Sequence, residues 1–276
     1  MKRKNIGVLI CTISSIFVCM ITAFPIYWMI NISLKPRSHV FIYPPEILPL
    51  GFNISSYIQI FQTGDILIWI KNSMIVASST VILNLIAASL GAFGLSRFDF
   101  KINKVFIFLL MIVQMIAPAL IITPIYILFL NMNLTNSLIG LAIINTGMTV
   151  AFSTWVLKGF FDNIPSEIDE AASIDGCSKF QIFRKIILPL SVPALITIAV
   201  ITFFDVYNEY MFALTFITDQ SKWLATVGLA ANIAKIGVSW DIMLAQASLF
   251  CVPPILFFFI FQKYILKGIG EGALKY

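Results

Sequence analysis

Charge is scarce in this sequence. Only 11% of its 276 residues are Asp, Glu, Lys or Arg, whereas 59% are hydrophobic and the mean hydropathy is +0.96. A soluble globule of this size needs more polar surface than such a composition supplies. The composition therefore argues against an ordinary soluble domain and predicts a protein embedded in a lipid bilayer.

Histidine and cysteine are also scarce, which limits the chemistry open to the chain. His39 is the only histidine, and this argues against a His-based zinc site or a Ser-His-Asp triad. The four cysteines, scattered without a C-x-x-C pair, indicate neither a disulfide framework nor a metal site. They are Cys11, Cys19, Cys177 and Cys251. No catalytic constellation is visible, so we expect no enzyme activity, cofactor or metal in this chain.

A phosphate-binding loop is missing as well. The pattern G-x-x-x-x-G-K-[ST] requires a glycine followed by lysine, and none of the 14 glycines precedes a lysine. The chain therefore cannot bind nucleotide phosphates through such a loop.

Long charge-free runs are what the sequence does contain, and each has room for a spanning helix of about 20 residues. The longest run, 105–157, is too long for one crossing and is divided by the polar stretch 131–136. The first apolar run far exceeds the ~7–15 residues of a signal-peptide core, so we expect it to be retained. The sequence thus predicts a single transmembrane domain over 1–276. Its six expected spans are 7–31, 67–95, 105–130, 137–157, 190–217 and 242–266, with a long loop at 158–189.

The basic residues predict the orientation of these spans, because Lys and Arg accumulate in cytoplasmic loops. With both termini in the cytoplasm, 13 of the 18 Lys and Arg lie inside, among them Lys4 and Lys275. The net charge of +5 is then explained by topology, and no nucleic-acid partner is needed. The five basic residues expected outside are Lys35, Arg37, Lys71, Lys222 and Lys235.

The long cytoplasmic loop contains a polar stretch, 170–189, that reads EAASIDGCSKFQIFRKIILP. Pro165 discourages helix before it, and Ser166 with Asp169 three residues on resembles a capping box. Gly176 is suited to the left-handed conformation that ends a helix. We expect a short helix from 166 to 176, with acidic side chains in its first turns.

One face of this short helix combines small and apolar residues that another surface can approach closely. Its members at i, i+3, i+4 and i+7 are Ile168, Ala171, Ala172 and Asp175. A second helical run, 179–187, is expected to place Phe180, Phe183 and Ile187 on one side before Pro189 starts the next span. The residues alone leave two interpretations open: a solvated connector, or an elbow on which a cytoplasmic partner docks.

A family resemblance favours the docking interpretation. The EAA signature of permease subunits of binding-protein-dependent ABC importers resembles this loop at every signature position and with its spacing. Those positions are Glu170, Ala171, Ala172, Gly176, Ile186, Leu188 and Pro189. Stretches at 33–36, 43–49, 207–214 and 262–273 are similar to the second permease subunit of maltose-type and multiple-sugar importers. Cys177 and Glu271 depart from the common pattern without touching the signature.

The resemblance implies an all-α membrane protein with the type I ABC importer permease fold: six transmembrane helices and a cytoplasmic coupling-helix elbow. The elbow residues, with Asp175 among them, would seat in an ATP-binding subunit that holds ATP and Mg. The implied partners are a second permease subunit, cytoplasmic ATP-binding subunits and an extracytoplasmic sugar-binding protein, at a bacterial cytoplasmic (inner) membrane. Closure of the ATPase pair would push the elbows together and switch the spans from inward- to outward-facing.

Span five also carries polar residues. Asp205 and Glu209 lie at i and i+4 with Asn208 beside them, and charge inside a membrane normally faces a cavity or a partner. They indicate either the outer end of a sugar path or groups that snorkel to the interface or pair with the partner subunit. Tyr207 and Tyr210 suit sugar stacking but are equally usual at membrane interfaces.

Other functions remain open at this stage. The elbow signature is shared by importers of non-sugar solutes, such as glycerol phosphate. A polytopic membrane enzyme should show paired carboxylates or a nucleophile with its base, and only Asp205 and Glu209 come near that. A secondary carrier should show inverted repeats, and none is visible between the halves.

Overall fold

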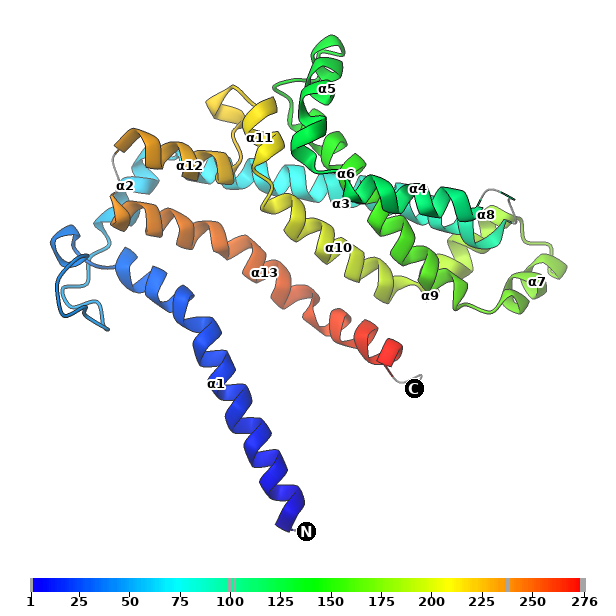
Figure 1. Cartoon of the computed structure of the whole chain (residues 1–276), viewed down its shortest axis with the longest axis horizontal. Helices are drawn as coiled ribbons and strands as arrows, with labels where there is room; N and C mark the ends of the chain where they lie inside the picture. The colour runs from blue at the N-terminus through cyan, green and yellow to red at the C-terminus, as the bar shows by residue number, and fades with distance from the viewer. Residues whose placement is uncertain (1, 99–100, 102, 237–238, 274–276) are drawn as a thin grey trace. The chain divides into compact units, whose positions relative to one another are not determined.

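The computed structural model describes residues 2–98, 101, 103–236 and 239–273, which form helices and connecting loops without a β-strand (Figure 1). The predicted all-α fold class is confirmed. The chain divides into two compact units. The first comprises Met1–Ile68 and Gly228–Val252, and the second comprises Trp69–Val227 and Pro253–Tyr276. Lys275, counted above as a cytoplasmic charge, lies outside the described residues.

The first unit contains the N-terminal helix and the loop that follows it. Its elements are α1 (Lys2–Ser33), a 3-10 turn (Arg37–His39), α2 (Ser55–Thr63), the start of α3 (Asp65–Arg97), most of α12 (Ala225–Ile236) and the first part of α13 (Trp240–Ala273). In α1 the apolar segment Cys11–Ser33 is long enough to cross a bilayer, and its most apolar window buries no residue within the protein. From Cys11 to Tyr27 this segment therefore presents its whole circumference to lipid or to another chain, whereas Asn31 and Ser33 in the last turn are buried.

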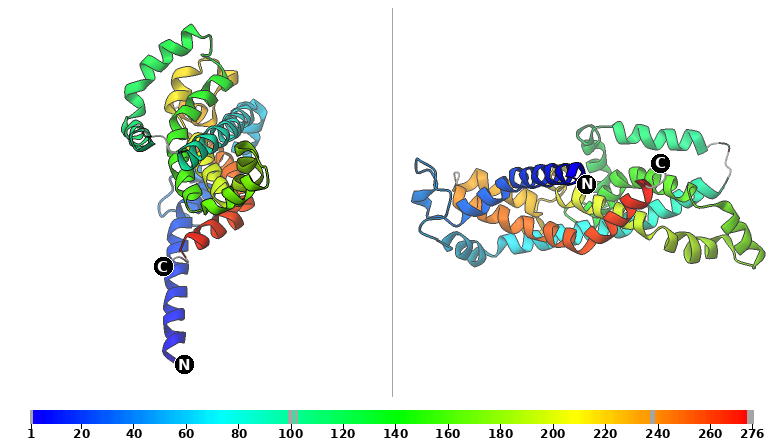
Figure 2. Two further views of the ribbon diagram at one scale, coloured as in Figure 1. Left: turned by 90° about the vertical axis from the view of Figure 1, so that its right-hand side faces the viewer. Right: turned by 90° about the horizontal axis from the view of Figure 1, so that it is seen from below.

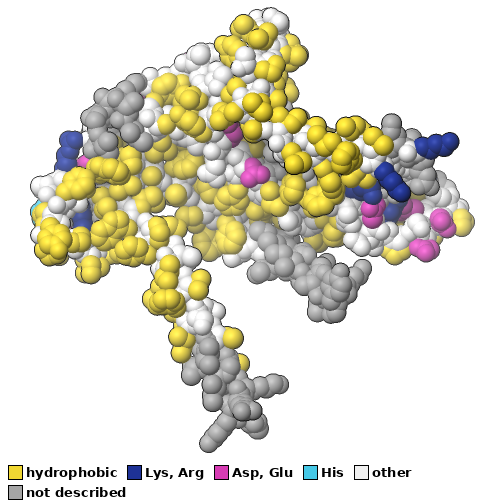
Figure 3. Space-filling view, in the orientation of Figure 1, with side chains coloured by type: hydrophobic (Ala, Val, Ile, Leu, Met, Phe, Trp, Pro, Cys, Tyr) yellow, Lys and Arg dark blue, Asp and Glu magenta, His cyan; other side chains and the backbone are white. Residues whose placement is uncertain are grey.

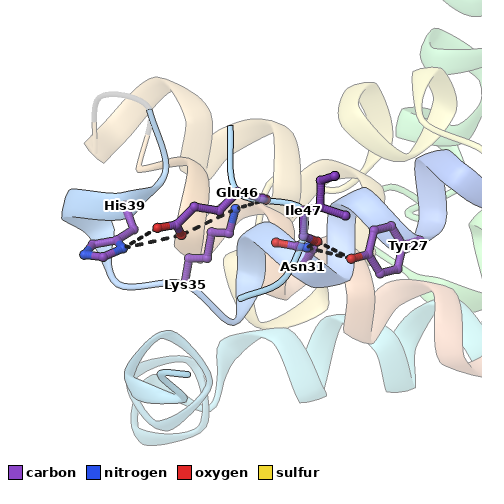
Figure 4. Close-up of polar contacts among 6 residues, drawn as sticks. All are labelled: Tyr27, Asn31, Lys35, His39, Glu46 and Ile47. Atoms are coloured by element: carbon purple, nitrogen blue, oxygen red, sulfur yellow. Dashed lines mark hydrogen bonds and ion pairs between the residues drawn. The ribbon is translucent and has the colours of Figure 1, made fainter. Parts of the chain in front are cut away.

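The loop after α1 folds back on the end of that helix through polar contacts (Figure 4). The Tyr27 hydroxyl and the Asn31 amide both donate to the Ile47 carbonyl. The Lys35 ammonium donates to the Glu46 carbonyl at 2.6 Å, and His39 Nδ1 lies 3.2 Å from the Glu46 carboxylate. These contacts hold residues 34–47 against the last two turns of the helix.

The second unit contains most of the bundle and the polar elbow. Its helices after α3 are α4 (Asn103–Met115), α5 (Pro118–Asn131), α6 (Leu138–Asp162), α7 (Ser166–Ile174), α8 (Lys179–Ile182), α9 (Leu188–Leu190), α10 (Val192–Tyr207) and α11 (Met211–Phe216). A π turn at Phe183–Ile187 joins α8 to α9, and a 3-10 turn lies at Gln220–Lys222. Three views place α7 and α8 together at one end of this unit (Figures 1 and 2).

Four of the six predicted spans coincide with single long helices: α1, α3, α6 and α13. The third predicted span, 105–130, is not one straight helix, because α4 and α5 meet at 98°. Pro118 is the first residue of α5, and the residue before a proline is disfavoured in the helical region. Ala117 accordingly adopts an extended conformation, with φ −63° and ψ 129°, and the chain turns there.

The fifth predicted span, 190–217, is also interrupted. Helix α10 ends at Tyr207, and α11 begins only at Met211. At the other end, Pro189 does not open the span, since it lies within α9, and α10 follows a 75° bend around Ser191. The apolar pattern predicts the membrane segment, whereas these breaks depend on individual polar residues and prolines.

The core of the second unit gathers residues from the spans and from the elbow. Helix α3 contributes Ala88, Ala92 and Phe93, while α6 contributes Leu157 and Phe161. Residues of α10 join the same cluster. The elbow contributes the side chains of Ala172, Ile182, Phe183 and Ile187. The elbow is therefore packed onto the bundle as part of one core.

Candidate functional site

Gly176 ends the first elbow helix as the sequence predicts. Its φ is +85°, and the amides at 175, 176 and 177 donate to the carbonyls of Ala171, Ser173 and Ala172. A Cβ atom added at Gly176 would meet no atom within 4 Å. The requirement for glycine here comes from the left-handed backbone and not from a lack of space.

The start of this helix differs from the prediction. Pro165 occupies the N-cap position and provides no side-chain cap, so the expected Ser166 and Asp169 capping box does not form. Asp169 is instead buried and lies 2.5 Å from the guanidinium of Arg97, at the end of α3. No local sequence pattern predicts this contact, because the two residues are 72 positions apart.

The second half of the elbow contains a capping box that the sequence analysis did not anticipate. Ser178 Oγ accepts a hydrogen bond from the Gln181 amide at 3.3 Å, and Gln181 Oε1 accepts one from the Ser178 amide at 2.8 Å. The sequence signal was present, since Ser followed three residues later by Gln is the standard pattern. This box fixes where α8 begins.

The inward face of the second run also differs from the prediction. Ile182 and Ile187 are fully buried and Phe183 nearly so, whereas Phe180 is 63% exposed. A regular α-helix would align Phe180, Phe183 and Ile187, but the π turn has an i to i+5 repeat. That repeat brings Ile182 and Ile187 to the same side and leaves Phe180 outside.

The predicted docking residues divide into two groups. Glu170, Ala171, Asp175 and Gly176 are exposed, together with Ile168 and the 87% exposed Ile174. Ala172 is only 8% exposed and packs in the core, so the expected four-residue docking face is wrong at this position. Ile186 and Leu188 pack against the same core, and Pro189 is exposed. Acidic and basic side chains gather at the elbow end of the molecule (Figure 3).

The break between α10 and α11 borders a cavity of about 600 Å³. Glu209 has partners within its own chain, because its carboxylate accepts hydrogen bonds from the amides of Phe212 at 2.6 Å and Ala213 at 2.9 Å. Asp205 lines the cavity as well, and within the described residues its side chain has no hydrogen bond or ion pair. Asn208 donates to the Phe204 carbonyl and does not line the cavity.

The cavity is otherwise mostly apolar. The α4–α5 turn borders it from one side, and α6 borders it from another. Its lining residues are Ala117, Pro118, Ala119, Asn145, Met148, Thr149, Asp205, Val206, Glu209, Tyr210, Met211 and Phe212. The two interruptions that the sequence analysis missed, at Ala117 and at 208–210, thus meet at one place in the unit.

The loop after α11 is fixed by hydrogen bonds to its backbone. Trp69 Nε1 donates to the Gln220 carbonyl, and Asn72 Nδ2 donates to the carbonyls of Ser221 and Trp223. Hydrogen bonds from the Ser221 hydroxyl and amide lower the pKa of the Asp219 carboxyl. These hydrogen bonds hold the loop against the first turns of α3.

An all-helical chain with several apolar spans and a polar elbow packed onto its bundle defines a membrane permease subunit. Residues 84–271 match the family described as "Binding-protein-dependent transport system inner membrane component". This chain belongs to that family, which confirms the resemblance read from the elbow signature.

Individual relatives match along nearly the whole chain. The chain is similar to the probable ABC transporter permease protein YurM of Bacillus subtilis, with 30% identity over 253 residues covering 92% of this chain and 84% of YurM. It is similar to the trehalose/maltose transport system permease protein MalG of Thermococcus litoralis, with 30% identity over 295 residues covering 100% and 99%. One chain of a bacterial alginate import ABC transporter has the same fold, with a TM-score of 0.82 at 22% identity, covering 95% and 97%.

Proposed function

We propose that this chain is the transmembrane subunit of an ATP-driven importer of a sugar or oligosaccharide. The observation that carries the proposal is the full-length similarity to a trehalose/maltose permease, together with the family match over residues 84–271. Similarity to permeases named for diacetylchitobiose and arabinooligosaccharides supports the same substrate class. The chain would form half of a translocation path and would not catalyse ATP hydrolysis.

The assembly would contain partners that supply what this chain lacks. Cytoplasmic ATP-binding subunits would hold ATP and Mg, because no glycine in this sequence precedes a lysine in a phosphate-binding loop. A second permease subunit would complete the path, and an extracytoplasmic binding protein would deliver the sugar. A solved alginate ABC transporter in complex with a periplasmic protein has the same fold, with a TM-score of 0.68. The chain would lie in a bacterial cytoplasmic membrane with both termini inside.

The elbow would be the surface that couples this chain to the ATP-binding subunit. Its exposed face offers the apolar Ile174 and Ile168 beside the carboxylates of Glu170 and Asp175. An apolar centre with an acidic edge suits a cleft that has a basic rim. Because the inner face of the elbow belongs to the bundle core, a displacement of α7 would also move the helices that are packed against the elbow.

The cavity beside the α10–α11 break would form part of the sugar path. Asp205 provides an acceptor for sugar hydroxyls, and Tyr210 provides a ring for stacking against a sugar face. Glu209 would shape the cavity indirectly, because its carboxylate accepts hydrogen bonds from the backbone amides in the first turn of α11. A solute other than a sugar, such as glycerol phosphate, is the second candidate, since the elbow signature is common to both. An unpaired carboxylate beside the path disfavours an anionic solute.

The experiment begins with the binding protein encoded or expressed alongside this chain. A sugar panel of maltose, trehalose, diacetylchitobiose and arabino-oligosaccharides is screened for ligands that raise its melting temperature. The assembled transporter is then reconstituted, and ATP hydrolysis is measured with the binding protein empty and loaded. Stimulation by a panel sugar supports the assignment. Stimulation by glycerol phosphate alone would favour the second candidate.

A further inference from the structure

Arg97 joins three elements that are separate in sequence. It is the last residue of α3. Its Nε lies 2.5 Å from Asp169 Oδ2 in α7. Both side chains are about nine-tenths buried, with 10% exposed for Arg97 and 8% for Asp169. Its Nη1 donates to the Phe161 carbonyl at 3.1 Å, and its Nη2 donates to the Ile164 carbonyl at 2.9 Å. Arg97 therefore bonds to the end of α6, to the linker after it, and to the first turn of the elbow.

The electrostatic arrangement favours this position for a cation. The carbonyl of Phe161 belongs to the last turn of α6, where the helix dipole is negative, and Asp169 lies in the first turn of α7. Asp169 Oδ1 is buried without a hydrogen-bond partner, so its negative charge depends on Arg97 for compensation. A buried pair of this kind is strongly destabilised when only one member is removed.

Neighbouring contacts bind the same three elements. Ser96 Oγ donates to Asp162 Oδ1 at 2.7 Å, which connects the last turn of α3 to the last turn of α6. Beneath the ion pair, the ring centroids of Phe93 and Phe183 lie 5.0 Å apart and connect α3 to the π turn of the elbow. The end of α3 thus contacts both halves of the elbow.

We propose that Arg97 is a positioning residue that transmits movement of the elbow directly to α3 and α6. The proposal rests on the coupling role assigned to the elbow above. Along the chain, residues 163–165 join the elbow to α6, and a 75° bend around Ser191 joins it to α10, whereas α3 is not its neighbour in sequence. The Arg97–Asp169 pair adds a non-covalent connection from the first turn of the elbow to α3, the longest helix of the second unit.

The variants remove the charge on each side of the contact. Arg97→Gln keeps amide donors for the two carbonyls but leaves the Asp169 charge uncompensated. Asp169→Asn removes the partner charge, and the double variant leaves a neutral pair that is free of any unpaired charge. Lys158→Gln is the matched control, because it breaks an i to i+4 ion pair with Asp162 that lies within α6 alone.

Two measurements are made on the assembled transporter with its ATP-binding subunits in nanodiscs. Hydrogen exchange of residues 166–175 reports whether α7 is held against the bundle. The amount of sugar transported per ATP hydrolysed reports whether movement of the elbow reaches the spans. We expect Arg97→Gln to accelerate exchange in α7 at least tenfold and to lower the transport ratio at least fivefold, without a fall in ATP hydrolysis in the absence of binding protein. The double variant should be impaired to about the same extent as Arg97→Gln, without the sum of the two single effects, since the residues act as a unit. Lys158→Gln should match wild type in both measurements.

The outcomes separate this proposal from the transport assignment. Wild-type exchange in α7, or a wild-type transport ratio, in either Arg97→Gln or the double variant overturns the role of Arg97. If Arg97→Gln does not assemble, the double variant decides the question by the same two measurements. If wild-type complexes hydrolyse ATP without response to any loaded binding protein, the sugar assignment fails, and the exchange result still supports or overturns the contact's role.

Discussion

The side chains of Asn84 and Thr202 join α3 to α10 inside the second unit: Asn84 Nδ2 donates to Thr202 Oγ1 at 2.8 Å. The same amide donates to Ser153 Oγ of α6 at 2.7 Å, and all three residues are buried. One asparagine therefore connects three spans in an apolar interior. Interhelical hydrogen bonds of this kind hold membrane helices in register without a hydrophobic driving force.

Replacing Asn84 with alanine is expected to destabilise the folded bundle by about 1–2 kcal/mol, because two interhelical hydrogen bonds are lost. Thr197→Val is the matched control, since the Thr197 hydroxyl bonds only to the Pro193 carbonyl of its own helix. The measurement is the midpoint of denaturation of the assembled transporter in detergent. Equal midpoints for the two variants would show that the three-helix contact contributes nothing.

Gly176 provides a test of the backbone at the elbow. Gly176→Ala is expected to cost about 1–2 kcal/mol locally, because an L-residue is strained at φ +85° although the space is open. Gly94→Ala is the control, because Gly94 also has open space but lies inside α3 without a positive φ. Uptake and loaded-binding-protein-stimulated hydrolysis should fall together for Gly176→Ala only. Wild-type uptake in Gly176→Ala would show that the turn does not need its left-handed geometry.

The two adjacent alanines of the elbow are expected to behave differently. Ala171 is exposed, so Ala171→Arg should fold and pair with the second permease subunit normally but block docking of the ATP-binding subunit. Ala172 is buried in the core, so Ala172→Arg should prevent folding or assembly. Size-exclusion chromatography and ATP hydrolysis distinguish the two failures. Normal transport by Ala171→Arg would indicate that the elbow is only a connector.

The spans and the elbow could be predicted because their signals are local. Charge-free runs identify four long helices, and the sequence around Gly176 identifies the left-handed turn. The direction in which Ala172 faces could not be predicted, because i to i+4 spacing defines a helix face but not what covers it. The same applies to Arg97 and Asp169, whose contact depends on packing across 72 positions.

The broken spans show a different limit. Hydropathy is averaged over a window, so it does not register the extended residue before Pro118 or the chain break at 208–210. The contacts of Glu209 with the Phe212 and Ala213 amides could not be predicted, because they form only where the chain turns between α10 and α11. A charged residue inside a predicted span can therefore mark the start of a new helix as well as a position on the translocation path.

Topology remains a prediction that labelling can test directly. Cysteine introduced at Lys4 or Lys275 should resist a membrane-impermeant maleimide in intact cells, since the distribution of basic residues places both termini inside. Cysteine at the exposed Lys71, near the outer end of α3, should react under the same conditions. Efficient labelling at either terminus would reverse the assigned orientation.

Sugar uptake by reconstituted vesicles tests the central claim most directly. The complete transporter is placed in proteoliposomes with ATP enclosed on the side of the ATP-binding subunits, and the loaded binding protein is added to the other side. We expect accumulation of the panel sugar that stabilises the binding protein, dependent on ATP and abolished by Ala171→Arg although the variant permease is folded. Assembled wild-type transporter that hydrolyses ATP yet accumulates no sugar, or that accumulates it equally with Ala171→Arg, would contradict the account.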